Sequence, residues 1–246
     1  MKNEFSDVPV FVFSYEERTI DFCKHCLNRI GFTNIFSVYG KTTFYEKLIE
    51  FSEIASDLNE DFYIRVDADR FVFDGVIDLI REFIDLKLDN CQGVCFDFLM
   101  NKTRHSTPHI YSNHLIKEMQ SKNIKILDSN KPESDIMKQV KNKKNINILT
   151  NLHDYEQYPS KVTNTFINRL YRNHGGHYNW NQLKGNGLER EIEAAFIFHK
   201  DNGAKTDCSY IEEFKKFDLG TPSINSSDFP SLYDKYYQLY NQIKLI

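Results

Sequence analysis

The chain lacks the long apolar run that a membrane span needs, because none of its hydrophobic stretches approaches about 18 residues. Its start, Met1 to Glu4, does not look like a secretion signal, so we expect a cytoplasmic protein. Cysteines are few and odd in number, five in 246 residues, which favours free thiols in such a compartment. Hydrophobic residues still make up 41%, which is enough for one large domain or a core with an appendage.

Two loop signatures are also missing from the sequence. It has no glycine-rich loop that would cradle a phosphate, and no nucleophile elbow of the kind found in hydrolases. A diphosphate ligand would therefore have to be held mainly through a cation. Internal repeats and long low-complexity tracts are absent as well.

Charge is unevenly distributed along the chain. Residues 1–100 carry 10 Lys and Arg against 19 Asp and Glu, whereas residues 101–190 carry 15 against 7. The basic middle indicates either an anionic partner or an evenly solvated lysine-rich surface. We expect three of its arginines to line a cleft for acceptor or donor phosphates, because guanidinium groups suit phosphate: Arg104, Arg169 and Arg172.

Strand patterns alternate with helix patterns through the first hundred residues, which predicts an α/β fold with a mostly parallel sheet and flanking helices. The predicted strands cover residues 8–13, 34–39, 62–66 and 93–98, and the helices cover 14–31, 44–58 and 76–84. After these, the sequence predicts a polar loop at 101–108, a helix at 111–119, and strands at 124–127 and 146–149 around a helix that begins near 132. Beyond 158 the patterns are helical.

The tripeptide Asp67-Ala68-Asp69 follows the buried-type strand at 62–66. Two carboxylates at positions i and i+2, where a strand runs out into a loop, can both reach one hard cation such as Mg²⁺ or Mn²⁺. Solvated turn aspartates would look the same. In open parallel sheets, ligands bind beyond the carboxyl ends of the strands, and Ser14-Tyr15 reaches the same kind of position.

Other polar residues are weaker candidates. His153 ends a strand and is a plausible third ligand for the cation. Glu133 and Asp135 lie in the first turn of a helix, where acids are expected for capping, but either could act as a general base. His174 and His177 have metal-ligand spacing with two glycines between them. The pair Cys23 and Cys26 lies mid-helix, which favours core packing over metal binding.

Taken in order, these pieces resemble the nucleotide-sugar glycosyltransferases of the GT-A fold, particularly the family 2-like bacterial and phage enzymes. The resemblance lies in a first strand ending in Ser14-Tyr15, a later one ending in Asp67-Ala68-Asp69, an acidic helix start at Glu133-Ser134-Asp135 and a strand ending in His153. It covers roughly residues 8–156. It implies a GT-A core over 1–156 and leaves a helical extension over 157–246.

The resemblance also implies roles for individual residues. Asp69, Asp67 and His153 would hold a Mn²⁺ or Mg²⁺ ion that bridges the donor diphosphate, although Asp67 could instead face the ribose. The nucleotide would be bound by Ser14, Tyr15, Glu17 and Arg65. Glu133 or Asp135 would deprotonate the acceptor, and the family's adjacent Glu-Asp pair is here separated by Ser134, so the choice stays open. An inverting reaction follows if that base faces the anomeric carbon.

The implied function is transfer of a sugar from a nucleotide-diphosphate donor to an acceptor hydroxyl. A surface glycan is the default acceptor, and the basic middle also permits a modified DNA base, as in phage enzymes. A non-catalytic nucleotide- or glycan-binding module is an alternative of another class. A nucleotidyltransferase is a further alternative, although its first loop would be rich in glycine and lysine, whereas Ser14-Tyr15-Glu16-Glu17 is acidic.

Overall fold

A computed structural model describes residues 4–15, 17–39, 43–97, 102–129, 132–153, 155–158 and 218–245. Its centre is a seven-stranded sheet with the order β2-β1-β3-β6-β5-β7-β4. The strands are β1 Val10–Ser14, β2 Ile35–Tyr39, β3 Phe62–Asp67, β4 Arg70–Val72, β5 Asn90–Asp97, β6 Lys102–Ser112 and β7 Lys143–His153. In the part of the chain described, five strands run in one direction and only β6 and β4 run in the other. The predicted α/β fold with a mostly parallel sheet is confirmed.

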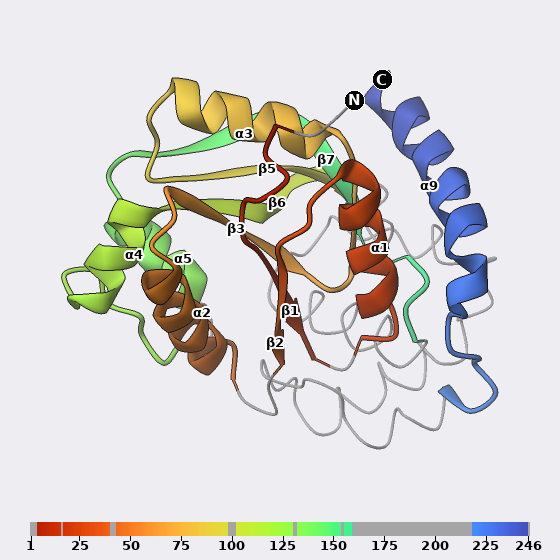
Figure 1. Ribbon diagram of the computed structural model, residues 1–246, viewed down its shortest axis with the longest axis horizontal. Helices are drawn as coiled ribbons and strands as arrows, with labels where there is room; N and C mark the ends of the chain where they lie inside the picture. Colours follow the sequence, from red (N-terminus) through yellow and green to blue (C-terminus); the bar gives the residue numbers. More distant parts are fainter. Residues whose placement is uncertain are drawn as a thin grey trace.

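Helices cover both faces of this sheet (Figure 1). They are α1 Ile20–Ile30, α2 Phe44–Leu58, α3 Gly75–Asp85, α4 Asn113–Gln120, α5 Pro132–Gln139 and α9 Phe229–Lys244, with a 3-10 turn η2 at Ser226–Asp228. Two of the ends follow from local sequence. Gly31 takes the left-handed conformation that closes α1, with φ of 104°, and Thr43 and Glu46 form a reciprocal capping box at the start of α2.

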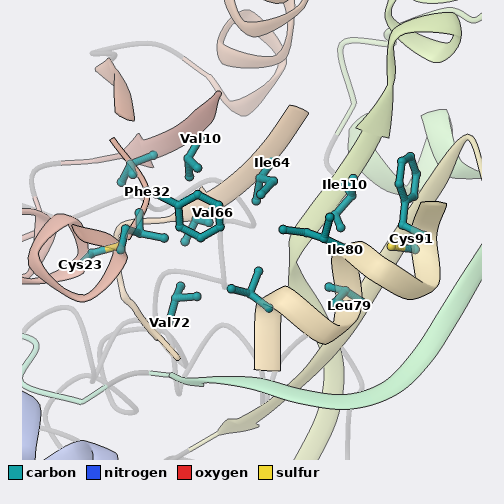
Figure 2. Close-up of a cluster of buried hydrophobic side chains, with 14 of the residues drawn as sticks. Val10, Cys23, Phe32, Ile64, Val66, Val72, Leu79, Ile80, Cys91 and Ile110 are labelled. Carbon is teal, nitrogen blue, oxygen red and sulfur yellow. The ribbon is translucent and has the colours of Figure 1, made fainter. Parts of the chain in front are cut away.

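Strand alternation divides the buried side chains between the two faces. In β1, Val10 and Val12 face a cluster formed with α1 and α3, whereas Phe11 and Phe13 face a second cluster formed with α2, α4 and α5. Figure 2 shows the first cluster, in which Ile80 of α3 lies close to Ile110 of β6. The sheet is therefore the middle layer of a helix–sheet–helix sandwich.

The C-terminal helix α9 closes a third cluster at the β4 edge of the sheet. Tyr233, Tyr236 and Tyr240 are buried there against Phe71 and Phe73. The Tyr240 hydroxyl donates to the Leu149 carbonyl of β7 at 2.9 Å and accepts from the Gly75 N–H of α3 at 3.2 Å. The last helix is thus packed directly on the sheet. None of the helices described is long and apolar enough to span a membrane.

Two predictions along the chain are wrong. The polar stretch 101–108 is not a loop, because residues from Lys102 onward form β6, which pairs antiparallel with both β3 and β5. The apolar stretch 124–127 is not a strand. The Gln139 side chain pairs with both backbone groups of Lys125, at 2.9 Å each, so a side chain takes the place of a neighbouring strand.

Candidate active site

The carboxyl ends of the parallel strands meet at one edge of the sheet, and four of them end in a polar residue. Ser14 ends β1, Asp67 ends β3, Asp97 ends β5 and His153 ends β7. Ligands in open α/β sheets bind beyond this edge. Three of the four were singled out from the sequence, and the structure brings them to one side of the molecule.

Arg65 connects Asp67 with Glu133. Residues 65 and 67 lie on the same face of β3 because side chains alternate along a strand. The buried Arg65 guanidinium is 2.8 Å from Asp67 Oδ1 through one terminal nitrogen and 2.8 Å from Glu133 Oε1 through the other. Burial alone would lower the pKa of Arg65, but these two carboxylates raise it. Its cation lies over the rings of Phe13 and Phe44, 5.1 Å from each centroid.

Glu133 is held by one of its two carboxylate oxygens. Tyr111 donates its hydroxyl to Oε1 at 2.8 Å, and His109 Nε2 lies 3.5 Å from the same atom. Both residues project from one face of β6 toward α5, again through strand alternation. Burial raises the pKa of Glu133, but Arg65, His109 and Tyr111 outweigh it, so that the pKa is lowered and the side chain is ionised at neutral pH.

Asp135 lies apart from this group. Its carboxylate accepts from Ser129 Oγ at 2.6 Å and pairs with Lys138 at 2.6 Å, one helical turn further along α5. Hydrogen bonds from Lys138 and Ser129 lower the pKa of Asp135. Of the two acids predicted as candidates for the base, the structure brings only Glu133 to the edge where Asp67 lies.

Arg70 lies between the two aspartates of the tripeptide. Its side chain is almost fully buried; Nε is 3.2 Å from Asp69 Oδ1, and a terminal nitrogen is 3.8 Å from Asp67 Oδ2. The same terminal nitrogen donates to Ser106 Oγ at 3.1 Å. Asp69 also faces His153, whose Nε2 is 3.2 Å from Asp69 Oδ2. The two predicted ligands are therefore neighbours, although 84 positions separate them in the sequence.

The His153 ring is also held through its second nitrogen, Nδ1. In the sheet it pairs laterally with Arg70 of β4 and with Asp97 of β5. Its Nδ1 lies 3.0 Å from Asp97 Oδ2 and 3.0 Å from a terminal nitrogen of Arg104. Arg104 Nε is also 2.7 Å from Asp97 Oδ2. Acids and bases thus alternate from Glu133 to Arg104 across the edge of the sheet.

The end of β1 is closed by a carboxylate and a buried lysine. Ser14 Oγ donates to Glu17 Oε2 at 2.7 Å, and the Tyr15 N–H donates to the same oxygen. Lys47 of α2 is fully buried, donates to the Ser14 carbonyl and places its ammonium over the Tyr15 ring. Three of the four residues predicted to bind the nucleotide, Ser14, Tyr15 and Glu17, therefore form one hydrogen-bonded loop.

The turn between Asp67 and Asp69 is anchored through its middle residue. The Ala68 N–H donates to the Phe13 carbonyl at 2.9 Å, and the Ala68 carbonyl accepts from Thr19 Oγ1 at 2.8 Å. Gln157 then donates to that Thr19 oxygen at 2.5 Å. The strand β1, the residue before α1 and the segment after β7 together fix the direction in which the two aspartates point.

The chemistry of these side chains fits a divalent cation. Asp67 and Asp69 keep 29% and 21% of their side-chain surface exposed, and the second nitrogen of His153 faces a carboxylate, as is usual for histidines that bind metals. Within the described ranges no three His, Cys, Asp or Glu side chains are arranged to hold a metal by themselves. Magnesium often takes only one or two carboxylates and completes its shell with water and substrate phosphate.

Several residues of this edge were missed in the sequence, and two of them left a signal. Asp97 lies next to the last residue of the strand predicted over 93–98, a polar residue near a strand end as Asp67 is. Lys47 occupies an apolar-face position of α2, at helical spacing from Phe44 and Phe51. Tyr111 and His109 left no signal in the sequence. Four predicted residues lie outside the described part of the chain: Arg169, Arg172, His174 and His177.

Cys23 and Cys26 are free and fully buried, which agrees with the predicted core packing. Burial, with Asp69 and Asp67 nearby, raises the pKa of Cys23. Its Sγ lies 3.9 Å from the Asp67 carbonyl, within the core behind the turn. Neither cysteine belongs to the group of polar side chains at the edge.

No protein-family model and no curated protein matches this chain. Among solved structures, TarS 1–349 of S. aureus aligns with 87% of this chain and 79% of its own, at 14% identity and a TM-score of 0.42. Bifunctional IspDF of Campylobacter jejuni aligns with 58% of this chain, at 14% identity and a TM-score of 0.42. That alignment spans only 50% of IspDF. The 4-diphosphocytidyl-2C-methyl-D-erythritol synthase of Anaerococcus prevotii aligns with 62% of this chain and 91% of its own, at 12% identity and a TM-score of 0.39.

At 12–14% identity and TM-scores of 0.39–0.42, these likenesses carry no argument about this chain. A function has to be argued from this chain's own side chains.

Proposed function

We propose that the chain is a metal-dependent glycosyltransferase that moves a sugar from a nucleotide-diphosphate donor to an acceptor hydroxyl. One observation carries the proposal. Asp67, Asp69 and His153, which could contact a cation, share an edge of the sheet with Glu133, which could accept a proton, and Arg65 bridges the two groups. Cation ligands and a base side by side are what transfer from a diphosphate to a hydroxyl requires.

Each residue of the edge has a part in this proposal. A bound Mn²⁺ or Mg²⁺ would neutralise the charge that develops on the leaving nucleoside diphosphate. Asp67 and Asp69 would orient the donor through their exposed oxygens. The loop of Ser14, Tyr15 and Glu17 would receive the nucleoside, because it lies at the end of the neighbouring strand β1.

Glu133 is the favoured base because its two oxygens differ. The contacts from Arg65, Tyr111 and His109 all fall on Oε1, and 21% of the side chain remains exposed. Oε1 is anchored while Oε2 is available to take the proton of an acceptor hydroxyl. Asp135 is tied to Lys138 on the surface and is the weaker candidate.

A glycan acceptor fits the charge distribution better than a nucleic acid. The exposed lysines of the basic middle include Lys141, Lys143 and Lys144, around the start of β7. His153 ends the same strand ten residues later, roughly 30 Å away at the usual rise per residue. Phosphates bound by those lysines would lie at the opposite end of β7 from His153.

The test is calorimetric titration of nucleotide sugars in the presence of Mn²⁺, after a thermal-shift screen has selected the donor. We expect Asp69→Asn to fold normally and to lose metal-dependent donor binding, because an amide keeps the shape of a carboxylate but not its charge. Asp85→Asn, an exposed aspartate at the end of α3, is the matched control and should bind as the parent does.

Three outcomes would contradict the proposal. Unchanged donor affinity in Asp69→Asn would remove the metal from the binding step. Donor binding without any sugar transfer, across a panel of glycan and nucleic-acid acceptors, would instead favour the non-catalytic binding module. Release of diphosphate from a nucleoside triphosphate in the presence of a sugar phosphate would favour a nucleotidyltransferase.

A further inference from the structure

Tyr111 is a tyrosine of β6 whose hydroxyl points at the proposed base. Its side chain is buried in the second apolar cluster, where its ring packs edge-on against Phe51 of α2 with the centroids 5.2 Å apart. Among the described residues its hydroxyl has one hydrogen-bond partner, Glu133 Oε1, at 2.8 Å. Because a buried hydroxyl is costly unless it is paired, packing and pairing together fix the direction of this O–H.

Tyr111 differs from the other two groups that contact Glu133. Arg65 divides its guanidinium between Glu133 and Asp67, at 2.8 Å from each. His109 Nε2 is more distant, at 3.5 Å, and burial lowers the pKa of His109 to about 4, so the imidazole is neutral at neutral pH. Burial and the neighbouring Glu133 raise the pKa of Tyr111, so its hydroxyl keeps its proton. Tyr111 is therefore an uncharged donor that serves Glu133 alone.

Two donors on one carboxylate oxygen decide where a proton can bind. Arg65 has N–H groups only and cannot accept, and a Tyr111 hydroxyl turned away from Oε1 would leave its own buried proton without an acceptor. Protonation of Glu133 at Oε1 would therefore break both contacts. Oε2 lies outside these contacts, and 21% of the side chain is exposed. Oε2 is thus the oxygen that can take a proton at little cost.

We propose that Tyr111 is the positioning residue for Glu133: its hydroxyl anchors Oε1 and thereby presents Oε2 to the acceptor as the oxygen that takes the proton. This inference rests on the proposed function, in which Glu133 is the base. In that reaction the acceptor oxygen bonds to the sugar carbon as the bond to the diphosphate breaks, and the acceptor proton passes to Oε2. Tyr111 keeps its own proton throughout.

A purely structural hydroxyl could make the same contact, so the control variant has to match its burial. Tyr63 of β3 lies directly opposite Tyr111 in the sheet and belongs to the same apolar cluster. It has no exposed surface, and its hydroxyl accepts from the Glu60 N–H at 2.8 Å. Tyr63→Phe therefore removes a buried hydroxyl from the same cluster without touching Glu133.

The decisive measurement is the titration of the Glu133 carboxyl group, followed by ¹³C NMR of the protein labelled with ¹³C-glutamate. Glu133→Gln identifies the signal by its loss. The Tyr111 hydroxyl favours the ionised carboxylate, so we expect the pKa of Glu133 to rise in Tyr111→Phe and to stay parental in Tyr63→Phe. Three neighbours that also act on this pKa are the same in both variants: Arg65, Arg70 and His109.

The second readout is sugar transfer as a function of pH. In Tyr111→Phe we expect the acid limb of the pH–rate profile to move to higher pH, because the base becomes protonated more easily. Turnover on the plateau should fall about 10–100-fold, because the carboxylate can then rotate, whereas the KM for the donor should not change. Tyr63→Phe should keep the parental profile.

A folded Tyr111→Phe variant with the parental Glu133 titration overturns the proposal, and so does an acid limb that stays in place. If Tyr111→Phe fails to fold, the parent decides. Labelling with ¹³C-tyrosine should then show a ring carbon that shifts with the midpoint of the Glu133 carboxyl group and no longer does so in Glu133→Gln, and its absence overturns the proposal. If the parent transfers no sugar, the proposed function fails, whereas the titrations still decide whether Tyr111 holds Glu133.

Discussion

At the residue scale, acidic and basic side chains alternate in space across the edge of the sheet, so that charges of one sign do not gather there. Arg65, Arg70 and Arg104 each contact at least one carboxylate, and every one of those carboxylates lies at a strand end, a turn or a helix start. Such pairing lets a buried arginine remain charged, and it also holds the acids in fixed directions. The choice between Glu133 and Asp135, which the sequence left open, is therefore a question of which acid these arginines orient.

Replacing Glu133 by glutamine should remove the proposed base while keeping most of its contacts. The amide oxygen can still accept from Tyr111 and Arg65, so we expect the fold to persist and turnover to fall by about 10²–10⁴-fold. Asp135→Asn should keep parental turnover, because that carboxylate contacts only Ser129 and Lys138 in the contacts described. Initial rates with saturating donor compare the two. Equal losses in both variants would contradict the assignment of Glu133.

His109 should make the stability of the protein depend on pH. Burial, with Arg65 close by, lowers its pKa to about 4 against the attraction of Glu133, whereas an unfolded histidine takes up a proton near pH 6.5. Between these values the unfolded chain binds the extra proton. The free energy of unfolding therefore falls as the pH drops through this window, by up to about 1.4 kcal/mol per pH unit from this residue.

Urea denaturation of His109→Gln at pH 7, 6 and 5 measures this contribution. We expect the free energy of unfolding of the variant to depend less on pH than that of the parent, by up to the contribution of one bound proton. His114→Gln is the matched control, because His114 is exposed on α4. A His109→Gln variant that retains the full parental pH dependence would show that His109 is not the group responsible.

At the element scale, α9 is attached to the sheet by one buried hydroxyl. Tyr240→Phe removes the donor to the Leu149 carbonyl and the acceptor of the Gly75 N–H, and we expect a loss of about 1–3 kcal/mol in the free energy of unfolding. Tyr237→Phe should be nearly neutral, because its hydroxyl is 3.4 Å from Asp74 and is not buried. Chemical denaturation of both variants makes the comparison. Equal stabilities would mean that the rings alone hold α9.

Elements with a strong hydrophobic periodicity could be predicted from the sequence. Elements that depend on pairing with other segments of the chain could not. The helix α2 has its predicted limits because a capping box and an apolar face coincide there. The strand β6 was missed because its first half is polar and becomes a strand through pairing on both sides. Residues 124–127 have the composition of a strand, but the Gln139 side chain forms hydrogen bonds with the N–H and the carbonyl of Lys125 that a neighbouring strand would otherwise use.

The same limit applies to the candidate site. Asp67, Asp69 and His153 could be selected because a carboxylate or imidazole at a strand end is visible in the sequence. The pairing of Asp69 with His153 depends on β4 lying beside β7, which no local pattern encodes. Arg65 could not be distinguished from a donor-binding residue, since its burial and its bridge to Glu133 arise only when α5 packs on the sheet.

At the scale of the whole molecule, the basic and acidic regions of the sequence do not separate into two facing surfaces. Two acids of the basic middle are neutralised by basic partners: Glu133 pairs with Arg65 of β3, and Asp135 pairs with Lys138 within α5. What remains exposed at the start of β7 is a small group of lysines. These face solvent at the end of β7 opposite to His153.

This placement predicts that the lysines at the start of β7 do not take part in turnover. Lys141→Gln combined with Lys144→Gln should leave the rate and its salt dependence at the parental values, because both side chains are exposed and lie roughly 30 Å from the end of β7. Arg104→Gln should lower the rate, since Arg104 contacts both Asp97 and His153. Rates at 50 and 200 mM salt provide the comparison, because each lost phosphate contact flattens the salt dependence of nucleic-acid binding. A flatter salt dependence in the double lysine variant would instead assign an extended anionic acceptor to that end of the sheet.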